Sequence, residues 1–291
     1  MAEQPQGCYE ATPLTHMLLA PFFVDAITHI HGHILPAFTA LHASQDSTRA
    51  SRTAFQVAKR TDQEFYTWLE HHPAQHSAFY RFMEAQFQSL PSWLDVVAFD
   101  SEVAQDARRG DVLFVDVGGG NGSQCAALRE RFPSLQGRIV LQDRPAVLEN
   151  AAVIEGVEKM AHNFLTEQPL KNARAYYFRQ ILHNYDDDTC IQILQMNLPA
   201  LLENPLSRLY IDEKVLPDEV PGSASTEAAS AEHNAAPSLA MTAVFGAQER
   251  KEKKWRWLLD QAGMEVLDIR RFTDLGDSII VAKRRYQDQW R

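Results

Sequence analysis

The sequence has few cysteines, no long apolar run and no excess of basic residues, and each shortage excludes a class of protein. Its three cysteines, Cys8, Cys125 and Cys190, stand far apart, so we expect neither a disulfide framework nor a cysteine-rich zinc site. No stretch has the roughly 18 consecutive apolar residues that a membrane helix needs. No basic segment followed by an apolar core marks a secretory signal near Met1. We therefore expect a cytoplasmic protein with no membrane partner.

Acidic residues outnumber basic residues. The 291 residues carry a formal net charge of −10, with 38 Asp and Glu against 28 Lys and Arg. A nucleic-acid-binding protein needs a basic surface to meet phosphates, so we expect no nucleic-acid partner. Hydrophobic residues make up 45% of the chain, which is ordinary for a globular protein. A length of 291 residues is sufficient for one large domain with an accessory region.

Two different patterns divide the chain near residue 100. Before it, apolar residues recur three and four positions apart, as in residues 22–30, which predicts helices. After it, short apolar runs alternate with helical patterns. These strand-like runs cover residues 111–117, 138–143, 173–178, 208–213, 266–271 and 277–283. The pattern predicts a helical region over residues 1–100 and an α/β domain over residues 101–291, with a Rossmann-like, doubly wound and mostly parallel sheet.

Residues 219–237 fit neither pattern. They read EVPGSASTEAASAEHNAAP and offer little apolar surface to bury. Strand-like runs lie on both sides, so this stretch is predicted to be a surface loop rather than a linker between domains.

A glycine-rich turn joins the first of these strands to a helix, in the segment Val115-Asp-Val-Gly-Gly-Gly-Asn-Gly-Ser123. Gly118, Gly120 and Gly122 let a ligand approach the backbone, and the helix behind them offers free N–H groups. Dinucleotide-binding proteins need a third glycine where this chain has Ser123, so their GxGxxG pattern is not met. Asp116, just before the turn, would repel a pyrophosphate but suits an ammonium group, as in the methionine end of S-adenosylmethionine.

A second carboxylate favours the same ligand. Asp143 ends the next predicted strand, 21 residues after Gly122. A carboxylate in this place can accept hydrogen bonds from the ribose hydroxyls of an adenosine. In the alternative interpretation the turn is only a tight connection and Asp143 is a solvated residue at a strand end. The combination of strand, acid, glycine turn, helix and second acid favours the adenosyl ligand.

Five segments in order carry a resemblance to a known family. They are Phe114–Ser123, Leu141–Pro145, Tyr176–Asn184, Ile211–Pro217 and Phe245–Arg250. With them the chain resembles O-methyltransferases of the plant caffeate and flavonoid type, in their fungal secondary-metabolite branch. The resemblance implies S-adenosylmethionine as the methyl donor. It also implies a small aromatic acceptor, phenolic or polyketide-like, that is methylated on a hydroxyl.

The resemblance also implies how the chain is organised. Members of this family usually begin with a winged-helix domain of roughly a hundred residues that forms the dimer. This chain begins near the end of that domain and is expected to lack most of it. Residues 1–100 would then be a substrate cap or a remnant of the dimerisation domain, and both a homodimer and a monomer stay open.

The resemblance assigns roles to particular residues. His183 matches the general base, and Glu213 and Glu249 match the two carboxylates that flank it. The cofactor is expected to contact Asp116, Gly118, Gly120, Gly122, Asp143, Asn163, Phe164 and Arg179. Met241 and Phe245 are expected to line the acceptor pocket, because they neighbour Glu249 in sequence. No metal site is predicted, and the histidines at 29, 31 and 33 are interpreted as a polar helix face.

The chemistry requires a base near the acceptor hydroxyl. A phenol has a pKa of about 10, and a histidine, at about 6.5, can take its proton as the methyl group is transferred. A carboxylate on the far ring nitrogen fixes the tautomer. Without the resemblance, His183 would be interpreted as a residue at a helix start, and Glu213 and Glu249 as solvated carboxylates. The charged run Glu249–Lys254 is expected to be a solvated helix start.

Three departures from the family pattern leave a second hypothesis open. Asn184 stands where the family commonly has Asp, Asn163 stands where it has an acid near the adenine, and the chain begins late in the family's pattern. The alternative is an S-adenosylmethionine-binding homologue that does not methylate, either an accessory subunit or an enzyme of rearrangement or cyclisation. A third class, the nicotinamide-dependent oxidoreductases, is disfavoured by Ser123 and Asp116.

Overall fold

The computed structural model describes residues 2–4, 8–10, 35–37, 39, 52–87, 91–202, 204–218 and 241–285, without the side chains of 2–4, 8–10, 80 and 82–87. The apolar repeat of residues 22–30, the histidines at 29, 31 and 33 and the predicted loop over 219–237 lie outside these residues. The chain forms two compact units, the first comprising Met1–Leu90 and Ser238–Ala247 and the second Pro91–Pro237 and Gln248–Arg291.

The first unit is mainly helical where it is described. The helices whose bounds are described are α4 (Ala54–Lys59), α5 (Phe65–Glu70) and α6 (Pro73–Phe87), and residues 35–37 and 241–245 are also helical. Two short strands that the helical pattern did not predict, β1 (Ala2–Gln4) and β2 (Cys8–Glu10), pair antiparallel. Rings from different segments close a small core, in which Phe65 meets Phe55, Phe79 and Phe245 edge to face.

The second unit is built on an eight-stranded sheet in the order β5-β4-β3-β6-β7-β10-β9, with β8 paired to β7. The strands are β3 (Val112–Val117), β4 (Arg138–Asp143), β5 (Val157–Ala161), β6 (Ala175–Arg179), β7 (Arg208–Leu216), β8 (Arg250–Lys251), β9 (Met264–Arg271) and β10 (Asp277–Arg284). The strands from β5 to β7 run parallel, and β10 runs antiparallel to both β7 and β9. The predicted doubly wound, mostly parallel sheet is confirmed.

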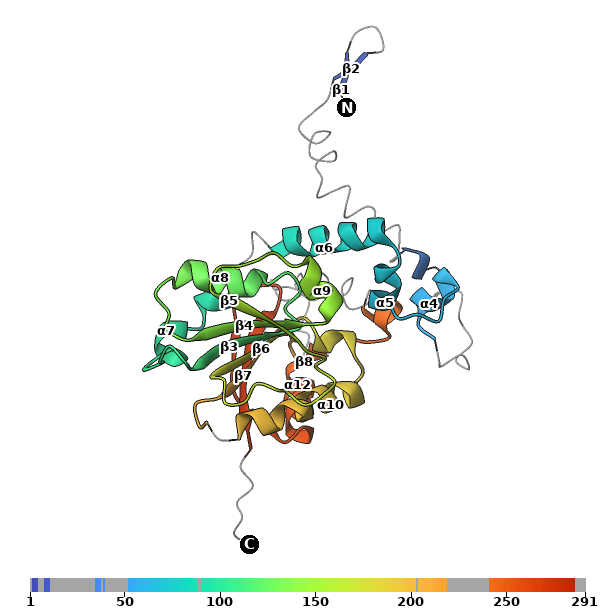
Figure 1. The fold of residues 1–291 in the computed structure, drawn as a ribbon. Coiled ribbons are helices and arrows are strands. Elements are labelled where there is room, and N and C mark those ends of the chain that lie inside the picture. Colours follow the sequence, from blue (N-terminus) through green and yellow to red (C-terminus); the bar gives the residue numbers. More distant parts are fainter. Residues whose placement is uncertain are drawn as a thin grey trace. The chain divides into compact units, whose positions relative to one another are not determined.

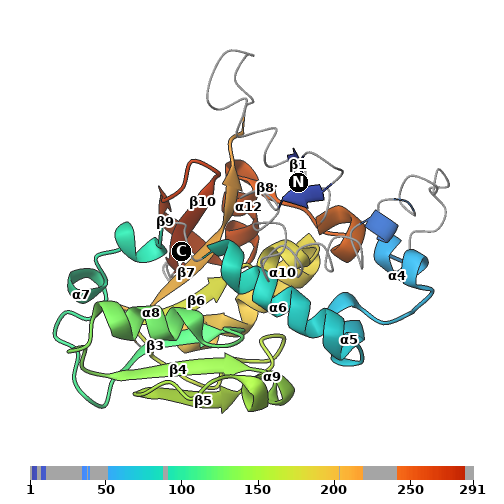
Figure 2. The same cartoon turned by 90° about the horizontal axis from the view of Figure 1, so that it is seen from above.

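Helices cover both faces of this sheet (Figure 1, Figure 2). They are η2 (Trp93–Asp95), α7 (Phe99–Glu102), α8 (Ser123–Arg131), α9 (Pro145–Asn150), η3 (Leu182–Asn184), α10 (Asp187–Asn197), η4 (Leu198–Leu201) and α12 (Glu252–Gln261). One apolar core lies between the sheet and α10 with α12, and a second lies between the sheet and η2, α7, α8 and α9. Within the described part of the chain, no helix is both long and apolar enough to cross a membrane.

The carboxyl ends of the parallel strands carry the segments that the sequence singled out. The glycine turn follows β3, Asp143 ends β4, and η3 with His183 follows β6. Strand β6 lies directly beside β3, so the glycine turn and η3 leave the same edge of the sheet from neighbouring strands. Glu213 does not end its strand as expected, because β7 continues to Leu216 and pairs there with β8.

Candidate active site

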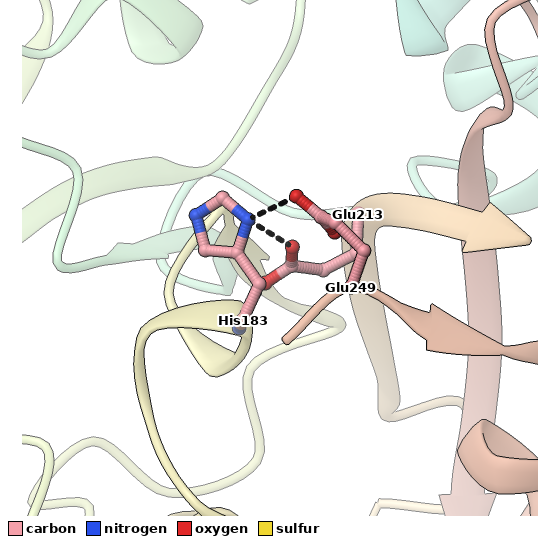
Figure 3. Close-up of side chains that lie close together, drawn as sticks. All are labelled: His183, Glu213 and Glu249. Carbon is pink, nitrogen blue, oxygen red and sulfur yellow. Dashed lines mark hydrogen bonds and ion pairs between the residues drawn. The ribbon is translucent and has the colours of Figure 1, made fainter. Parts of the chain in front are cut away.

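His183 and the two predicted carboxylates lie together. The Nδ1 atom of His183 is 3.1 Å from Oε1 of Glu249 and 3.5 Å from Oε2 of Glu213. Figure 3 shows both carboxylates approaching this one ring nitrogen, while the other nitrogen, Nε2, points away from them. The side chains come from η3, from β7 and from the residue before β8. This grouping leaves Nε2 as the ring nitrogen available to a ligand.

Burial and charge act in opposite directions on this imidazole. The His183 side chain is 12% exposed, and the two glutamates beside it are buried. Burial alone would lower the pKa of His183, but the negative charges of Glu213 and Glu249 outweigh it and raise that pKa to about 9. Burial has the opposite effect on a carboxyl and raises the pKa of Glu213 to about 7, although the neighbouring imidazole lowers it in part. The site therefore favours a positively charged imidazole before any proton is taken from a ligand.

Glu213 contacts the backbone as well as the ring. Its Oε1 accepts hydrogen bonds from the backbone N–H groups of Leu182, at 2.8 Å, and His183, at 3.3 Å. Its Oε2 faces the imidazole and has no hydrogen-bond partner among the described residues. Glu213 thus fixes the η3 backbone and also places negative charge beside the ring, a double role that the sequence does not reveal.

The charged run that begins at Glu249 is not a solvated helix start, contrary to the sequence expectation. Glu249 is 7% exposed and Arg250 only 2%. The physical reason is that Arg250 and Lys251 form β8, which pairs with Val215 and Leu216 of β7 and draws the start of the run into the protein. The solvated part of the run begins at Lys251, which is exposed although it pairs with Leu216.

The glycine turn after β3 adopts a conformation that suits a ligand site. Gly118, Gly120 and Gly122 have φ angles of +69°, +59° and +82°, in the left-handed region that favours glycine. A Cβ on Gly118 would come within 2.6 Å of Ile181 Cδ1, only two residues before His183. A Cβ on Gly120 would meet no described atom within 4 Å. The turn therefore packs against the His183 segment on one side and faces open space at Gly120.

Asp143 is tied to this turn. Its Oδ2 accepts a hydrogen bond from the N–H of Gly120 at 2.9 Å, and its Oδ1 accepts one from the N–H of Arg144 at 2.7 Å. Burial raises the pKa of Asp143, while these two backbone hydrogen bonds oppose the rise. The carboxylate is half-buried, and its remaining lone pairs can accept hydrogen bonds from the hydroxyls of a ribose.

Asp116 lies beneath the turn rather than beside open solvent. It is 1% exposed, and a Cβ on Gly119 would lie 2.4 Å from its Cγ. Cys125 Sγ donates to its Oδ2 at 3.5 Å, while Oδ1 has no partner within the described chain. Burial raises the pKa of Asp116 to about 7, although the Cys125 hydrogen bond opposes this. A contact between Asp116 and the ammonium of a ligand stays a prediction.

The other predicted cofactor residues have different surroundings. Phe164 lies beside the turn, because a Cβ on Gly118 would meet its Cε1 at 3.5 Å. Arg179 ends β6, and its Nε is 3.6 Å from Oδ2 of the buried Asp212. Asn163 is exposed, and its Oδ1 accepts the N–H of Leu165 at 3.1 Å. Asp212 was missed by sequence reasoning, since only its burial separates it from ordinary carboxylates.

The predicted acceptor-pocket residues belong to the first unit. Phe245 packs against Phe65, with ring centroids 5.3 Å apart, and against Tyr66 at 5.6 Å. Met241 is the first described residue of the helical stretch that leads to Phe245 and is half-buried. Ser238, which aligns with an acid of the family pattern, lies outside the described residues. The role of Met241 and Phe245 in the pocket stays a prediction.

His183, Glu213 and Glu249 also have the ligand types of a divalent cation site. Their ligand atoms all lie within 4.8 Å of one another. The same short distances are those of a histidine oriented by carboxylates, in which a proton on Nδ1 occupies the place of a cation. The arrangement therefore fits proton transfer as well as it fits a cation, and the role of these residues stays a prediction.

Comparison with known proteins identifies relatives of the whole catalytic region. Residues 84–265 match the model of an O-methyltransferase domain. The 16-O-methyltransferase bsc6 of Alternaria brassicicola is 37% identical over 98% of this chain and 71% of its own length. The demethylsterigmatocystin 6-O-methyltransferase of Aspergillus flavus is 35% identical over 86% of this chain and 61% of its own length. The matched part thus spans about two thirds of these relatives.

Two solved structures share the fold closely. One is described as a pericyclic reaction enzyme and the other as LepI in complex with SAM. Each superposes with a TM-score of 0.83 and 28% sequence identity, and the match covers 97% of this chain and 72% of the other. These comparisons cover the glycine turn, the carboxylates and His183 together.

Proposed function

This chain belongs to the O-methyltransferase family, and we propose that it transfers a methyl group from S-adenosylmethionine to a hydroxyl of a small aromatic secondary metabolite. The observation that carries the proposal is His183, held by Glu213 and Glu249 with Nε2 left available, two residues after Ile181, which packs on the glycine turn. A base and a ligand-binding turn thus leave one edge of the sheet together.

The residues around the turn fit S-adenosylmethionine, which supplies a methyl group already activated by a positive sulfonium. Gly120 opens toward unfilled space, and the Asp143 carboxylate beside it suits a ribose. The unpaired, buried Oδ1 of Asp116 suits an ammonium group. Phe164, next to Gly118, offers an apolar ring face to the adenosyl group. We assign these residues to holding the donor.

His183 is assigned the role of general base. With Nδ1 turned to Glu249 and Glu213, a neutral His183 presents Nε2 as the acceptor for the proton of the substrate hydroxyl. The positive charge that the ring gains is stabilised by the two buried carboxylates. General-base assistance of this kind contributes roughly 100-fold to 10,000-fold to a rate.

A direct experiment incubates the purified chain with S-adenosylmethionine carrying a deuterated methyl group and a panel of phenolic and enolic polyketides. The products are then analysed by mass spectrometry. The proposal predicts at least one acceptor that gains the labelled methyl on oxygen. Calorimetry with S-adenosylhomocysteine is run in parallel. Failure to bind S-adenosylhomocysteine, or transfer to nitrogen or carbon only, would contradict the proposal.

A second candidate function rests on the superposition with the pericyclic reaction enzyme at a TM-score of 0.83. In this alternative the chain binds S-adenosylmethionine but rearranges or cyclises its substrate without methylating it. The same incubation distinguishes the two functions. A substrate that is consumed to an isomer of unchanged mass, with no labelled methyl in any product, would select the alternative.

We further propose that the chain works as a homodimer in the cytoplasm. Cys125 and Cys190 are free, buried thiols, which accords with a reducing compartment. Light scattering after size-exclusion chromatography gives the mass of the assembly, and fractionation of cells that express the chain gives its location. A monomer at micromolar concentration would contradict the homodimer.

A further inference from the structure

Arg250 places a fully buried positive charge directly behind the turn that carries His183. Its side chain is 1% exposed. Its Nη1 donates to the carbonyl of Leu182 at 2.9 Å, and its Nη2 donates to the carbonyl of Tyr185 at 2.7 Å. Its Nε donates to Oδ1 of Asp187 at 3.1 Å. One carbonyl precedes His183 in the chain and the other follows it, so the guanidinium is hydrogen-bonded to the backbone on both sides of this residue.

The surroundings of this guanidinium connect the segments around His183 and Glu213. The Arg250 Cζ lies 5.5 Å from the ring centroid of Trp255 in α12, and Trp255 Nε1 donates to the carbonyl of Lys214, the residue after Glu213. Arg250 itself pairs with Val215 in β7. Glu249 directly precedes it in the chain. One buried side chain thus connects η3, the start of α10, α12 and the strand that carries Glu213.

Burying a guanidinium is strongly unfavourable unless its donors are satisfied and its charge is paired. Here the donors point in three directions, toward two carbonyls and one carboxylate. A lysine ammonium cannot reproduce this arrangement, because its donors radiate from one atom rather than from a planar fork. The geometry is therefore specific to arginine and centred on the His183 turn.

We propose that Arg250 is a positioning residue for methyl transfer, holding the Leu182–Tyr185 turn so that the His183 imidazole stays between Glu213 and Glu249. This inference rests on the proposed function for its catalytic consequence. The guanidinium contacts the backbone on either side of His183 and lies outside the reacting atoms. Displacing a catalytic group by about 1 Å can cost roughly 100-fold in rate.

Arg250 also acts on His183 through its charge. The charged groups that face the imidazole are Glu213 from β7, Glu249 from the residue before β8, and Arg250 from β8. The two carboxylates raise the pKa of His183, and Arg250 lowers it. Removing the charge of Arg250 therefore shifts the titration of His183 to higher pH, whereas a substitution that only weakens the fold does not.

The test compares Arg250→Lys, Arg250→Met and a matched control, Arg256→Met. Arg256 lies in α12, is half exposed, and pairs with Glu252 on the surface. We expect both Arg250 variants to lose about 100-fold in kcat toward the acceptor found in the panel. The KM for S-adenosylmethionine should stay within about twofold, since the glycine turn keeps its own contacts. The control should keep wild-type kcat.

A second readout does not depend on methyl transfer. NMR of protein labelled at histidine ring carbons follows the titration of His183 in the complex with S-adenosylhomocysteine. We expect the midpoint to rise in Arg250→Met and to stay near wild type in Arg250→Lys. If the wild-type chain methylates nothing, the proposed function fails while this titration still tests Arg250.

Wild-type kcat in both Arg250 variants, or an unshifted His183 midpoint in Arg250→Met, would overturn the proposal. If Arg250→Met does not fold, Asp187→Asn replaces it, because this change removes the charged partner of Nε and leaves Arg250 itself in place, and Lys254→Met serves as its control, since Lys254 is the other cation that pairs with Asp187. The expected result is then about a tenfold loss in kcat with unchanged binding of S-adenosylhomocysteine. Full activity in Asp187→Asn would contradict the positioning role.

Discussion

Glu249 lies 3.1 Å from Nδ1 of His183, although 66 positions of sequence separate the two residues. The contact joins the segment before α12 to the turn after β6, and it directs Nε2 away from the carboxylates. A carboxylate in this place fixes the tautomer and favours the charged imidazole. The proton affinity of the proposed base is therefore set by residues that lie far from it in the chain.

The first prediction concerns the dependence of catalysis on pH. Because Glu213 and Glu249 outweigh burial and raise the pKa of His183 to about 9, most of the free protein holds an imidazolium at pH 7. A base must be neutral, so kcat/KM should rise about tenfold per pH unit and level off near pH 9. Glu249→Gln removes one negative charge and should move the inflection to lower pH, as rate measurements between pH 6 and 10 would show.

A matched control for this profile is Glu252→Gln, at the exposed start of α12. Its inflection should coincide with that of the wild type. A profile that is flat through pH 7 to 9, or one that Glu249→Gln leaves unmoved, would show that this pair does not govern the base.

The second prediction concerns stability and Asp116. Burial raises the pKa of this carboxyl to about 7, against about 3.9 in the unfolded chain, so folding takes up a proton between these values. Stability is therefore lost as pH rises from about 4 to 7. Asp116→Asn lacks this penalty and should raise the free energy of unfolding by up to about 4 kcal/mol at pH 8 and by less at pH 5, measured in urea.

Asp100→Asn, at an exposed position of α7, serves as the control. It should change the free energy of unfolding by the same small amount at pH 5 and at pH 8. If Asp116→Asn destabilises the protein by the same amount at pH 5 and pH 8, the buried carboxylate does not carry the charge that this account assigns to it.

The third prediction separates ligand contact from backbone strain at the glycine turn. Gly120 and Gly263 both have positive φ, +59° and +80°, so an alanine at either costs about 1 kcal/mol in stability. Neither new Cβ would collide with a described atom. Only Gly120→Ala should lower the affinity for S-adenosylhomocysteine, by at least about tenfold, because its Cβ enters the space assigned to the ligand. Calorimetry that shows equal affinity for S-adenosylhomocysteine in the two variants would contradict the assignment of the ligand to this turn.

The sequence predicts the sheet better than it predicts the site. Strands such as β3 and β4 are buried on both faces and are therefore nearly continuous apolar runs. Such runs can be predicted from the sequence. Strand β5 was missed because it lies at the sheet edge and exposes Glu158 and Lys159. Edge strands carry charges that hide the apolar pattern.

Local sequence pattern was enough to predict only some of the site residues. The glycine turn and Asp143 are close in sequence, so local spacing indicates a ligand site. His183, Glu213 and Glu249 come from three separate segments, and only the family resemblance brought them together in advance. The sequence predicts a solvated Arg250. A run of charged residues has the same sequence pattern whether it is fully solvated or whether a short strand such as β8 buries part of it.

The most direct test of the central claim is the rate of methyl transfer in His183→Ala, measured in single turnover with saturating S-adenosylmethionine and the acceptor found in the panel. His71→Ala, an exposed histidine of the first unit, is the control. The account predicts a loss of 100-fold to 10,000-fold in His183→Ala, with wild-type binding of S-adenosylhomocysteine and a wild-type rate in the control. A His183→Ala protein that transfers the methyl group as fast as the wild type would contradict it.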